Sequence, residues 1–596
     1  MTGNILLLAY VSSRPKNIDG LAGRCIFLSQ DYIEYLRWKE IIKDKLESIE
    51  INEGLQKTAH HLRRPYMDLV AEMGHKYQSP AWWASRISEK NTAINYLFLY
   101  CCYLHLIKEK LLLLNGTLLV VCESWEVLRS LEECAKGLGW DTRWVRRPFP
   151  AQHLLILWKR MMGGILRFLY KAVLGKLAGS GSANFKENLP GILIHTYVDE
   201  GCFQKNGVFK DRYFPGLKEW LEKNGYSVLT LPVLYNLKRS YRSAWKWFKQ
   251  TGQKFLNPYR YYRISDYLFA IREALKQVFL PEGPVTLKGM DVSLLFLAER
   301  MNSSFGTLDS LLCYRLPQRL SQAGLKMDRL ILEYENMIDE KLLILGFRKY
   351  LPEVKLISFQ HGALYPLLLC NYVTREEAEY APLPDRVICN GEFFREILIQ
   401  EGMSPERVVA GPALRYAHLW KAEEKAEKSI DLLIPLPLMD REAVELLSKV
   451  SRAFRDRPDL KIVLKPHPMS SAEKILGRVK DIPSHFKLAQ VSMQELIFKT
   501  RVMVAISSSS IYEALAAGVP VVVVGREAAL DLNPLGFYNE MDKVFISPDQ
   551  IREEASRLMS FSEEELKSYR EFGKRILKSS FNPINDETLS VFVEAK

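Results

Sequence analysis

The chain has 596 residues, of which 48% are hydrophobic and 26% charged, an ordinary mixture for a globular protein. This composition excludes a largely disordered chain and supplies apolar material for roughly three or four domains. The net charge of +12 favours anionic partners such as nucleotides, acidic glycans or a lipid surface.

The cysteines and the apolar runs restrict the class of protein further. The nine cysteines are scattered without a C-x-x-C pair, which indicates reduced thiols in a cytoplasmic protein and no zinc site. The opening MTGNILLLAYVSS lacks the basic region and cleavage site of a signal peptide and predicts a buried strand. No run reaches the roughly 18 apolar residues of a membrane span. We expect no nucleic-acid partner, because no basic stripe alternates with aromatic residues.

Residues 1–150 predict an accessory α/β domain. NILLLAYV and GTLLVVCES have the apolar character of buried strands. A helical pattern that ends in glycine follows the second run, and the short strand-like DTRWV comes next. This alternation is typical of a parallel sheet.

Residues 151–188 combine a long helical pattern with the Gly- and Ser-containing linker GSGSANFKENLP. Arg160, Arg167 and Lys171 fall on one stripe of the helical wheel, and most other positions are apolar. Two interpretations stay open. The segment is either a helix lying on an anionic membrane surface, or a helix, or a pair broken at Gly163–Gly164, packed between domains.

Residues 189–403 and 404–596 each predict a Rossmann-like domain, the second with a closing helix. Strand-like runs in the first include GILIHTYV, RLILEYEN, VKLISFQHG and DRVICNG, and those in the second include DLLIPLPL, KIVLKPHP, RVMVAIS and VPVVVV. Near-continuous apolar strands between amphipathic helices indicate parallel sheets covered on both faces. The predicted fold class is therefore α/β, with two Rossmann-like parallel-sheet domains in tandem after an N-terminal α/β domain.

Polar residues follow four of these strands, at the edge where α/β sheets bind ligands. Lys465 and His467 alternate with prolines, which predicts a stiff turn presenting a cation and an imidazole to a phosphate. The candidate donor-binding residues at the four strand ends are Gln360, His361, Gly362, Asn390, Gly391, Lys465, His467, Pro468, Ser507, Ser508, Ser509 and Ser510.

The serine run at 507–510 has two parts. Ser510 and Glu513 fit a capping box, with Ser510 as the N-cap of the following helix. Ser507, Ser508 and Ser509 have no such explanation. Clustered hydroxyls at a helix N-terminus favour an anion, so the run predicts one wall of a phosphate site.

Residues from about 190 onward resemble glycosyltransferases of the GT-B fold, in particular bacterial enzymes that build capsule or lipopolysaccharide. Three motifs carry this resemblance: QHG at Gln360–Gly362, KPHP at Lys465–Pro468, and SSSSIYEALAAGVPVVV at Ser507–Val523. The last two are similar to motifs of bacterial sialyl- and Kdo-transferases, which use CMP-activated nonulosonate sugars. The resemblance implies that His467 binds the donor phosphate, that the serines bind phosphate or the sugar carboxylate, and that Glu513 contacts the ribose.

Two further stretches, WWASRISEKN and TYVDEGCF with the downstream FKDRYFPGL, are similar to surface-carbohydrate biosynthesis proteins. No D-x-D metal motif occurs in the chain, in keeping with the habit of GT-B enzymes of stabilising the leaving phosphate with protein charges and dipoles. We therefore expect neither a metal nor another cofactor.

A transferase also needs a base or nucleophile near the reacting carbon. Glu333 and Glu335 lie two residues apart in LILEYEN, so in a strand they would share one face. Glu335 is the first candidate and Asp199, after GILIHTYV, the second. Glu333 and His361 complete the set of candidates. The alternative is that the carboxylates are solvated loop acids or ion-pair partners of Arg and Lys residues.

The sequence thus predicts a metal-independent glycosyltransferase that moves a sugar, such as Kdo or a sialic-acid-like sugar, from a CMP-activated donor. The acceptor would be a growing surface polysaccharide or a lipid-linked glycan, and the location cytoplasmic, with peripheral contact to the inner face of the membrane. Three alternatives stay open: a CDP-glycerol-type glycerophosphotransferase, a UDP-sugar 2-epimerase-like enzyme, and an inactive scaffold of a polysaccharide assembly complex.

Overall fold

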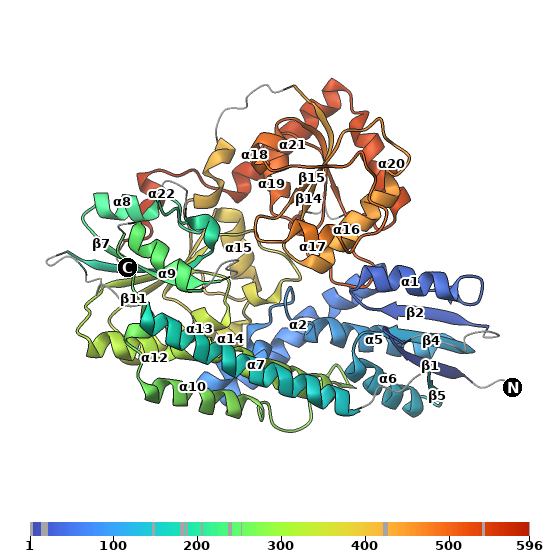
Figure 1. Cartoon of the computed structure of the whole chain (residues 1–596), viewed down its shortest axis with the longest axis horizontal. Helices are drawn as coiled ribbons and strands as arrows, with labels where there is room; N and C mark the ends of the chain where they lie inside the picture. Colours follow the sequence, from blue (N-terminus) through green and yellow to red (C-terminus); the bar gives the residue numbers. More distant parts are fainter. Residues whose placement is uncertain are drawn as a thin grey trace.

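The computed structural model describes the chain except for residues 1–3, 14–21, 146–149, 179–184, 186–188, 204–206, 236–240, 252, 421–426, 539–542 and 595–596. Three parallel sheets of five, six and five strands organise the described residues (Figure 1). The fold is α/β, and two Rossmann-like sheets in tandem follow an N-terminal α/β unit, as predicted. This confirms the expected fold class.

The N-terminal unit is a five-stranded parallel sheet in the order β3-β2-β4-β1-β5. Both long apolar runs of the sequence are strands, β1 and β4, and they pair directly. The hydroxyl of Ser124 caps the helix that follows β4. The elements are β1 (Ile5–Tyr10), β2 (Arg24–Leu28), α1 (Tyr32–Ile42), β3 (Glu47–Ser48), α2 (Asn52–Tyr77), α3 (Pro80–Trp83), α4 (Arg86–Glu89), α5 (Leu97–Leu113), β4 (Thr117–Cys122), α6 (Trp125–Gly137) and β5 (Asp141–Trp144).

The second unit is a six-stranded sheet in the order β13-β12-β11-β10-β6-β7. Its last strand, β13, pairs with β12 beyond the predicted domain boundary at residue 403. Its strands are β6 (Gly191–Val198), β7 (Ser227–Leu234), β10 (Arg329–Glu333), β11 (Lys355–Gln360), β12 (Arg386–Cys389) and β13 (Val408–Ala410).

Helices cover this sheet, and a helical insertion separates β7 from β10. A two-stranded antiparallel hairpin, β8 and β9, lies within the insertion. These elements are η1 (Glu200–Cys202), α8 (Leu217–Lys223), α9 (Tyr241–Gln250), η2 (Pro258–Arg260), α10 (Ile264–Gln277), β8 (Thr286–Leu287), β9 (Met290–Asp291), α11 (Ser293–Ser303), η3 (Ser304–Gly306), α12 (Leu308–Gln322), α13 (Ile338–Tyr350), η4 (Leu369–Asn371), α14 (Arg375–Tyr380) and α15 (Glu392–Glu401).

The third unit is a five-stranded sheet in the order β16-β15-β14-β17-β18. Its central strands are buried almost throughout, as their apolar runs predict. Its elements, with the connection from the second unit, are η5 (Leu414–Trp420), β14 (Ile430–Leu436), α16 (Asp440–Ala453), β15 (Ile462–Pro466), α17 (Ala472–Leu476), β16 (Lys487–Leu488), α18 (Met493–Ile497), β17 (Thr500–Ala505), α19 (Ser510–Ala516), β18 (Val521–Val523), α20 (Pro548–Met559), α21 (Glu563–Ser580) and α22 (Asp586–Ser590).

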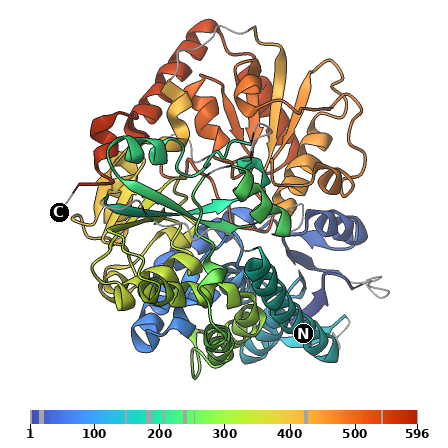
Figure 2. The same ribbon diagram turned by 60° about the vertical axis from the view of Figure 1, so that its left-hand side comes forward.

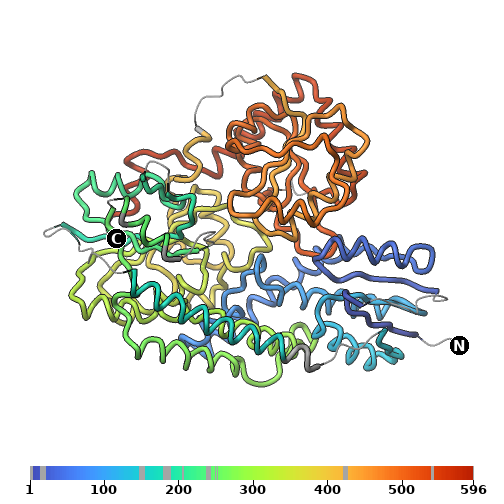
Figure 3. The backbone as a smooth tube through the Cα atoms, viewed as in Figure 1, coloured from blue at the N-terminus to red at the C-terminus, as the bar shows by residue number. Residues whose placement is uncertain are grey.

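The end of the chain returns to the second unit, as the red tube in Figure 3 shows. Leu589 and Phe592 are buried in the same apolar cluster as Ile192 of β6. The Phe592 ring lies 5.7 Å from that of Phe359 in β11. The closing segment therefore completes the core of a sheet that begins at Gly191.

Helix α7 (Pro150–Leu177) is continuous, so the pair of helices broken at Gly163–Gly164 is not found. Phe168 and Ala172 are buried against the insertion. Lys171 forms an ion pair with Asp309 of α12 at 2.5 Å and so turns away from the predicted cationic stripe. The predicted linker that follows lies mostly outside the described residues.

The N-terminal unit is wedged between the other two, with α2 reaching the centre of the molecule (Figures 1 and 2). On one side, Gln56 donates to the Ala529 carbonyl at 2.9 Å. On the other side, Lys90 and Glu377 form an ion pair whose side chains are almost inaccessible to solvent. The predicted accessory domain is thus part of the junction between the two Rossmann-like domains.

We expect Lys90→Met to destabilise the protein, because the substitution leaves the Glu377 carboxylate buried without its ion-pair partner. The free energy of unfolding should fall by about 3 to 5 kcal/mol, measured from urea denaturation. Lys57→Met is the matched control, since Lys57 and Glu53 form an ion pair whose side chains are mostly exposed. Such pairs contribute about 1 kcal/mol or less, so equal losses in the two variants would contradict the prediction.

Candidate active site

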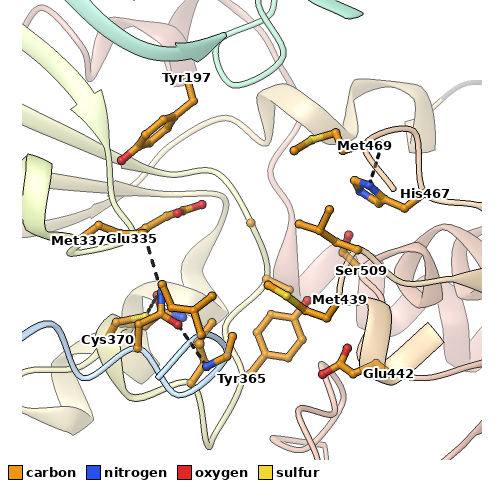
Figure 4. Close-up of a pocket in the computed structure, with 18 of the residues that line it drawn as sticks. Tyr197, Glu335, Met337, Tyr365, Cys370, Met439, Glu442, His467, Met469 and Ser509 are labelled. Atoms are coloured by element: carbon orange, nitrogen blue, oxygen red, sulfur yellow. Dashed lines mark hydrogen bonds between the residues drawn. The ribbon is translucent and has the colours of Figure 1, made fainter. Parts of the chain in front are cut away.

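A cavity of about 1100 Å³ lies where the three units meet. Its walls come from the carboxyl ends of β10 and β11, from the loops after β14 and β15, and from residues 91–96 of the N-terminal unit. Figure 4 shows Glu335 on one side of the cavity and His467 and Ser509 on the other. Ligand sites at the carboxyl ends of parallel strands are the rule for such sheets.

Glu335 and His361 form the polar pair on the second unit's wall. The Nε2 atom of His361 lies 3.2 Å from a carboxylate oxygen of Glu335. The expectation that Glu333 and Glu335 share one strand face is wrong, because β10 ends at Glu333 and Asn336 takes a left-handed conformation with φ of 54°. The turn after β10 instead directs Glu335 alone into the cavity.

Burial and neighbouring charges shift the pKa values of this pair in opposite directions. Burial opposes ionisation of Glu335, but the hydrogen bond from His361 and the charges of His361 and Arg415 outweigh it and lower the pKa of the carboxyl. Burial also lowers the pKa of His361, although the hydrogen bond to Glu335 and the charge of Glu335 act to raise it. At neutral pH Glu335 is therefore an ionised acceptor that is held by a hydrogen bond from His361.

The other two candidate acids do not line the cavity. Glu333 is fully buried, where it shares a hydrogen bond with Nδ1 of His195 and accepts one from the backbone N–H of Tyr197, both at 2.9 Å. Burial raises its pKa well above the ordinary value. Asp199 accepts from Arg212 at 2.7 Å and from the backbone N–H of Gly201. Asp199 therefore orients Arg212, which does line the cavity.

The residues around QHG fix the turn that carries His361. The amide of Gln360 donates to the Gly362 carbonyl, and its oxygen accepts from the backbone N–H of Asn390 at 3.1 Å. Asn390 donates to the same Gly362 carbonyl at 3.3 Å. Gln360 and Gly362 line the cavity, whereas Asn390 lies behind them. Gly391 is the N-cap of α15 and packs against the backbone of Ser580, outside the cavity lining.

His467 is the member of KPHP that lines the cavity, whereas Lys465 and Pro468 do not. Its Nδ1 atom accepts a hydrogen bond from the backbone N–H of Met469 at 3.2 Å. Burial and the charges of Arg212 and Arg415 lower its pKa to about 4. The ring is therefore neutral at pH 7, and its proton sits on Nε2, so it acts as a hydrogen-bond donor rather than a cation.

The four serines have separate environments. Ser507 donates to Glu442, and Ser508 and Ser510 hydrogen-bond to each other at 2.7 Å. Ser509 is the one of the four that lines the cavity. The predicted capping box is wrong, because α19 begins at Ser510 itself, and Ser509 occupies the N-cap position without a side-chain cap.

Glu513, the expected ribose contact, is not part of the cavity lining. Its carboxylate lies 3.6 Å from Nε2 of His418 in the segment that joins the second and third units.

Four arginines line the cavity, and the sequence singled out none of them: Arg212, Arg415, Arg441 and Arg526. Arg415 lies in η5, and its guanidinium is 5.7 Å from the centre of the Tyr213 ring, which in turn contacts His361 edge-on at 4.6 Å. Within the described part of the chain no carboxylate forms an ion pair with Arg415. Its place in a connecting segment gives no periodic signal, whereas Arg212 stands within a motif noted for resemblance.

The N-terminal unit and the loop after β14 close the remaining side. Asn91 and Tyr96 line the cavity, and the Arg441 guanidinium lies 5.5 Å from the centre of the Tyr96 ring. Arg441 also donates to Glu123 at 2.9 Å. Arg441 follows a buried strand, and this position could have marked it as a candidate cavity residue. Its pairing with Glu123 of another unit left no pattern in the sequence.

Among the residues that the structure describes, no three His, Cys, Asp or Glu side chains come together as a metal site would require.

Solved structures with a similar arrangement of α/β domains include three at low identity. Staphylococcus aureus MnaA with UDP is 14% identical over 68% of this chain and 94% of that chain, with a TM-score of 0.38. UDP-GlcNAc 2-epimerase from Neisseria meningitidis, bound to UDP-GlcNAc, is 11% identical over 68% and 98%, with a TM-score of 0.38. The calicheamicin glycosyltransferase CalG4 is 14% identical over 66% and 96%, with a TM-score of 0.36.

No protein-family model matches the chain, and no curated protein matches it either. The assignment of the fold rests on the strand orders of the three sheets.

We expect Arg415→Gln to raise the pKa of His467 from about 4 toward its ordinary value of 6.5, because the substitution removes a charge that opposes protonation. A histidine-selective NMR titration measures this pKa. Arg552→Gln is the matched control, since Arg552 pairs with Asp456 on the surface. An unchanged pKa in the Arg415 variant would contradict the arrangement described.

Proposed function

We propose that the protein is a metal-independent glycosyltransferase that uses a nucleotide-sugar donor in this cavity. The observation that carries the proposal is the placement of the ionised Glu335, held by His361, across the cavity from His467. The charge of Arg415 acts on both Glu335 and His467. A base on one side and anion-binding donors on the other are what transfer from a sugar phosphate requires.

The reaction follows from these positions. Glu335 takes the proton of an acceptor hydroxyl as its oxygen bonds to the anomeric carbon of the donor sugar. The bond from that carbon to the phosphate oxygen breaks, and the nucleotide leaves with the bonding electrons. The Nε2 proton of His467 and the Arg415 guanidinium stabilise the negative charge on the departing phosphate.

For the donor we propose a CMP-activated nonulosonate such as Kdo or a sialic-acid-like sugar. Such a donor carries a sugar carboxylate as well as a phosphate. Of the four arginines that line the cavity, Arg212 and Arg415 are the two whose charges act on His467, and they offer one guanidinium to each anion. The KPHP and serine motifs support the same donor class, since His467 and Ser509 line one wall.

For the acceptor we propose a growing surface polysaccharide or lipid-linked glycan, entering from the side of the N-terminal unit. Asn91 and Tyr96 offer an amide and an aromatic ring there, which suit a sugar. The cytoplasm is the location where nucleotide-activated donors would be used.

Calorimetry with CMP, UDP and GDP tests the donor. We expect CMP to bind, and Arg415→Gln and His467→Ala each to weaken that binding by about tenfold or more, since each removes a charged or hydrogen-bonding contact to phosphate. Arg552→Gln should bind like the unaltered protein. If none of the three nucleotides binds, the proposal fails, and if UDP binds in place of CMP, the donor class is wrong.

Glu335→Gln tests the base. We expect release of CMP from a CMP-linked sugar, in the presence of a glycolipid extract, to slow by roughly 100- to 10,000-fold. Nucleotide affinity should stay within about twofold. Glu353→Gln, an exposed carboxylate before β11, is the control and should leave the rate unchanged.

Product analysis separates the alternatives. A phosphodiester formed from CDP-glycerol would point to a glycerophosphotransferase, and epimerisation of a UDP-sugar without acceptor to an epimerase. Polysaccharide synthesis that survives His467→Ala in cells would favour the scaffold. Each of these outcomes would contradict glycosyl transfer.

A further inference from the structure

We propose that α7 and α10 together form a surface that binds an anionic lipid bilayer, called here the α7–α10 face. It is defined by three apolar side chains on each helix, all between 46 and 76% exposed: Leu166, Leu169, Val173, Ile264, Leu268 and Leu275. This surface is separate from the cavity lining, and its function does not depend on which reaction the cavity performs.

The two helices lie side by side along one edge of the molecule (Figures 1 and 2). The ring of Phe168 in α7 lies 5.5 Å from that of Tyr267 in α10. The ammonium of Lys176 lies over the same Tyr267 ring at 5.9 Å. These contacts hold the two helices next to each other, and we infer that their exposed sides form one surface.

On each helix the exposed apolar side chains lie opposite the side that packs on protein. In α7 the buried side chains are Phe168 and Ala172, and positions 166, 169 and 173 recur with helical spacing on the other side. In α10 the buried side includes Ala270 and Ala274, opposite Ile264 and Leu268. Exposed apolar stripes of this kind usually pack against another apolar surface, and no part of the described chain covers the stripes on α7 and α10.

The charge of the α7–α10 face is positive. Helix α7 contains no Asp or Glu. The two acids of α10, Asp266 and Glu273, are buried. Asp266 is held by Arg315 and Arg319 from α12. The exposed charged side chains on the two helices are cations: Lys159, Arg160, Arg167, Lys176, Arg272 and Lys276.

Apolar stripes flanked by cations, with no exposed acid, match the interface of an anionic bilayer. A second protein would have to offer an equally long acidic and apolar surface. Among the described helices none is long and apolar enough to cross a membrane, so the fitting arrangement is for α7 and α10 to lie in the plane of the interface.

Sedimentation of the full chain with vesicles tests the proposal. We expect binding to phosphatidylcholine vesicles that contain phosphatidylglycerol, weakening as salt is added, and far less binding to phosphatidylcholine alone. Leu166→Gln with Leu169→Gln should weaken binding on the order of tenfold, and Ile264→Gln with Leu268→Gln by a similar factor. If vesicle binding weakened in the α7 variant and not in the α10 variant, the proposed role of α10 would be overturned.

Leu488→Gln with Val491→Gln is the matched control, because both side chains are comparably exposed on the third unit. It should bind like the unaltered protein. Thermal unfolding should be unchanged in all variants, since the altered residues are exposed. Equal binding to neutral vesicles would overturn the proposal. So would a dimer, seen without vesicles by sedimentation velocity, that the α7 variant dissociates, because a second copy would then cover the face.

Discussion

The N-terminal unit contacts both Rossmann-like domains, and the cavity depends on the polar contacts that hold it to each of them. Tyr103 donates to the carbonyl of Ala528 in the third unit, and Lys341 of the second unit donates to that of Ser88 at 2.6 Å. Because such buried groups are costly to separate, these contacts help to fix the distance between the cavity walls, together with direct contacts between the two domains such as that of Phe394 with Tyr512. Glu335 and His467 come from different sheets, so their separation depends on both kinds of contact.

The arginines of the cavity differ in whether a carboxylate compensates their charge. Arg212 is held by Asp199, and Arg441 by Glu123. Arg415 instead rests on the face of Tyr213, and its charge acts on Glu335, His361 and His467 together. A guanidinium that influences these three groups, without a carboxylate of its own among the described residues, is suited to accept the charge of a ligand.

The sequence was informative where a chemical group follows a buried strand. His361, His467 and Ser509 all reach the cavity for this reason, and Glu335 does too. The sequence was misleading where a single backbone turn sets the direction of a side chain. The end of β10 at Glu333 separates two acids that a longer strand would have aligned, and a helix starting at Ser510 removes the capping box. Arg415 and the N-terminal wall come from connections and from packing between units, which leave no local pattern.

The return of the chain end to the second unit has a consequence for synthesis. The strand at Ile192 is made early, but the apolar side chains of Leu589 and Phe592 that cover its sheet are made only after the whole third unit. Domains generally fold from the N-terminus as they emerge, and this one must keep part of its sheet uncovered until Phe592 has been made. Loss of the segment that contains Leu589 and Phe592 would therefore damage a domain whose strands lie hundreds of positions upstream.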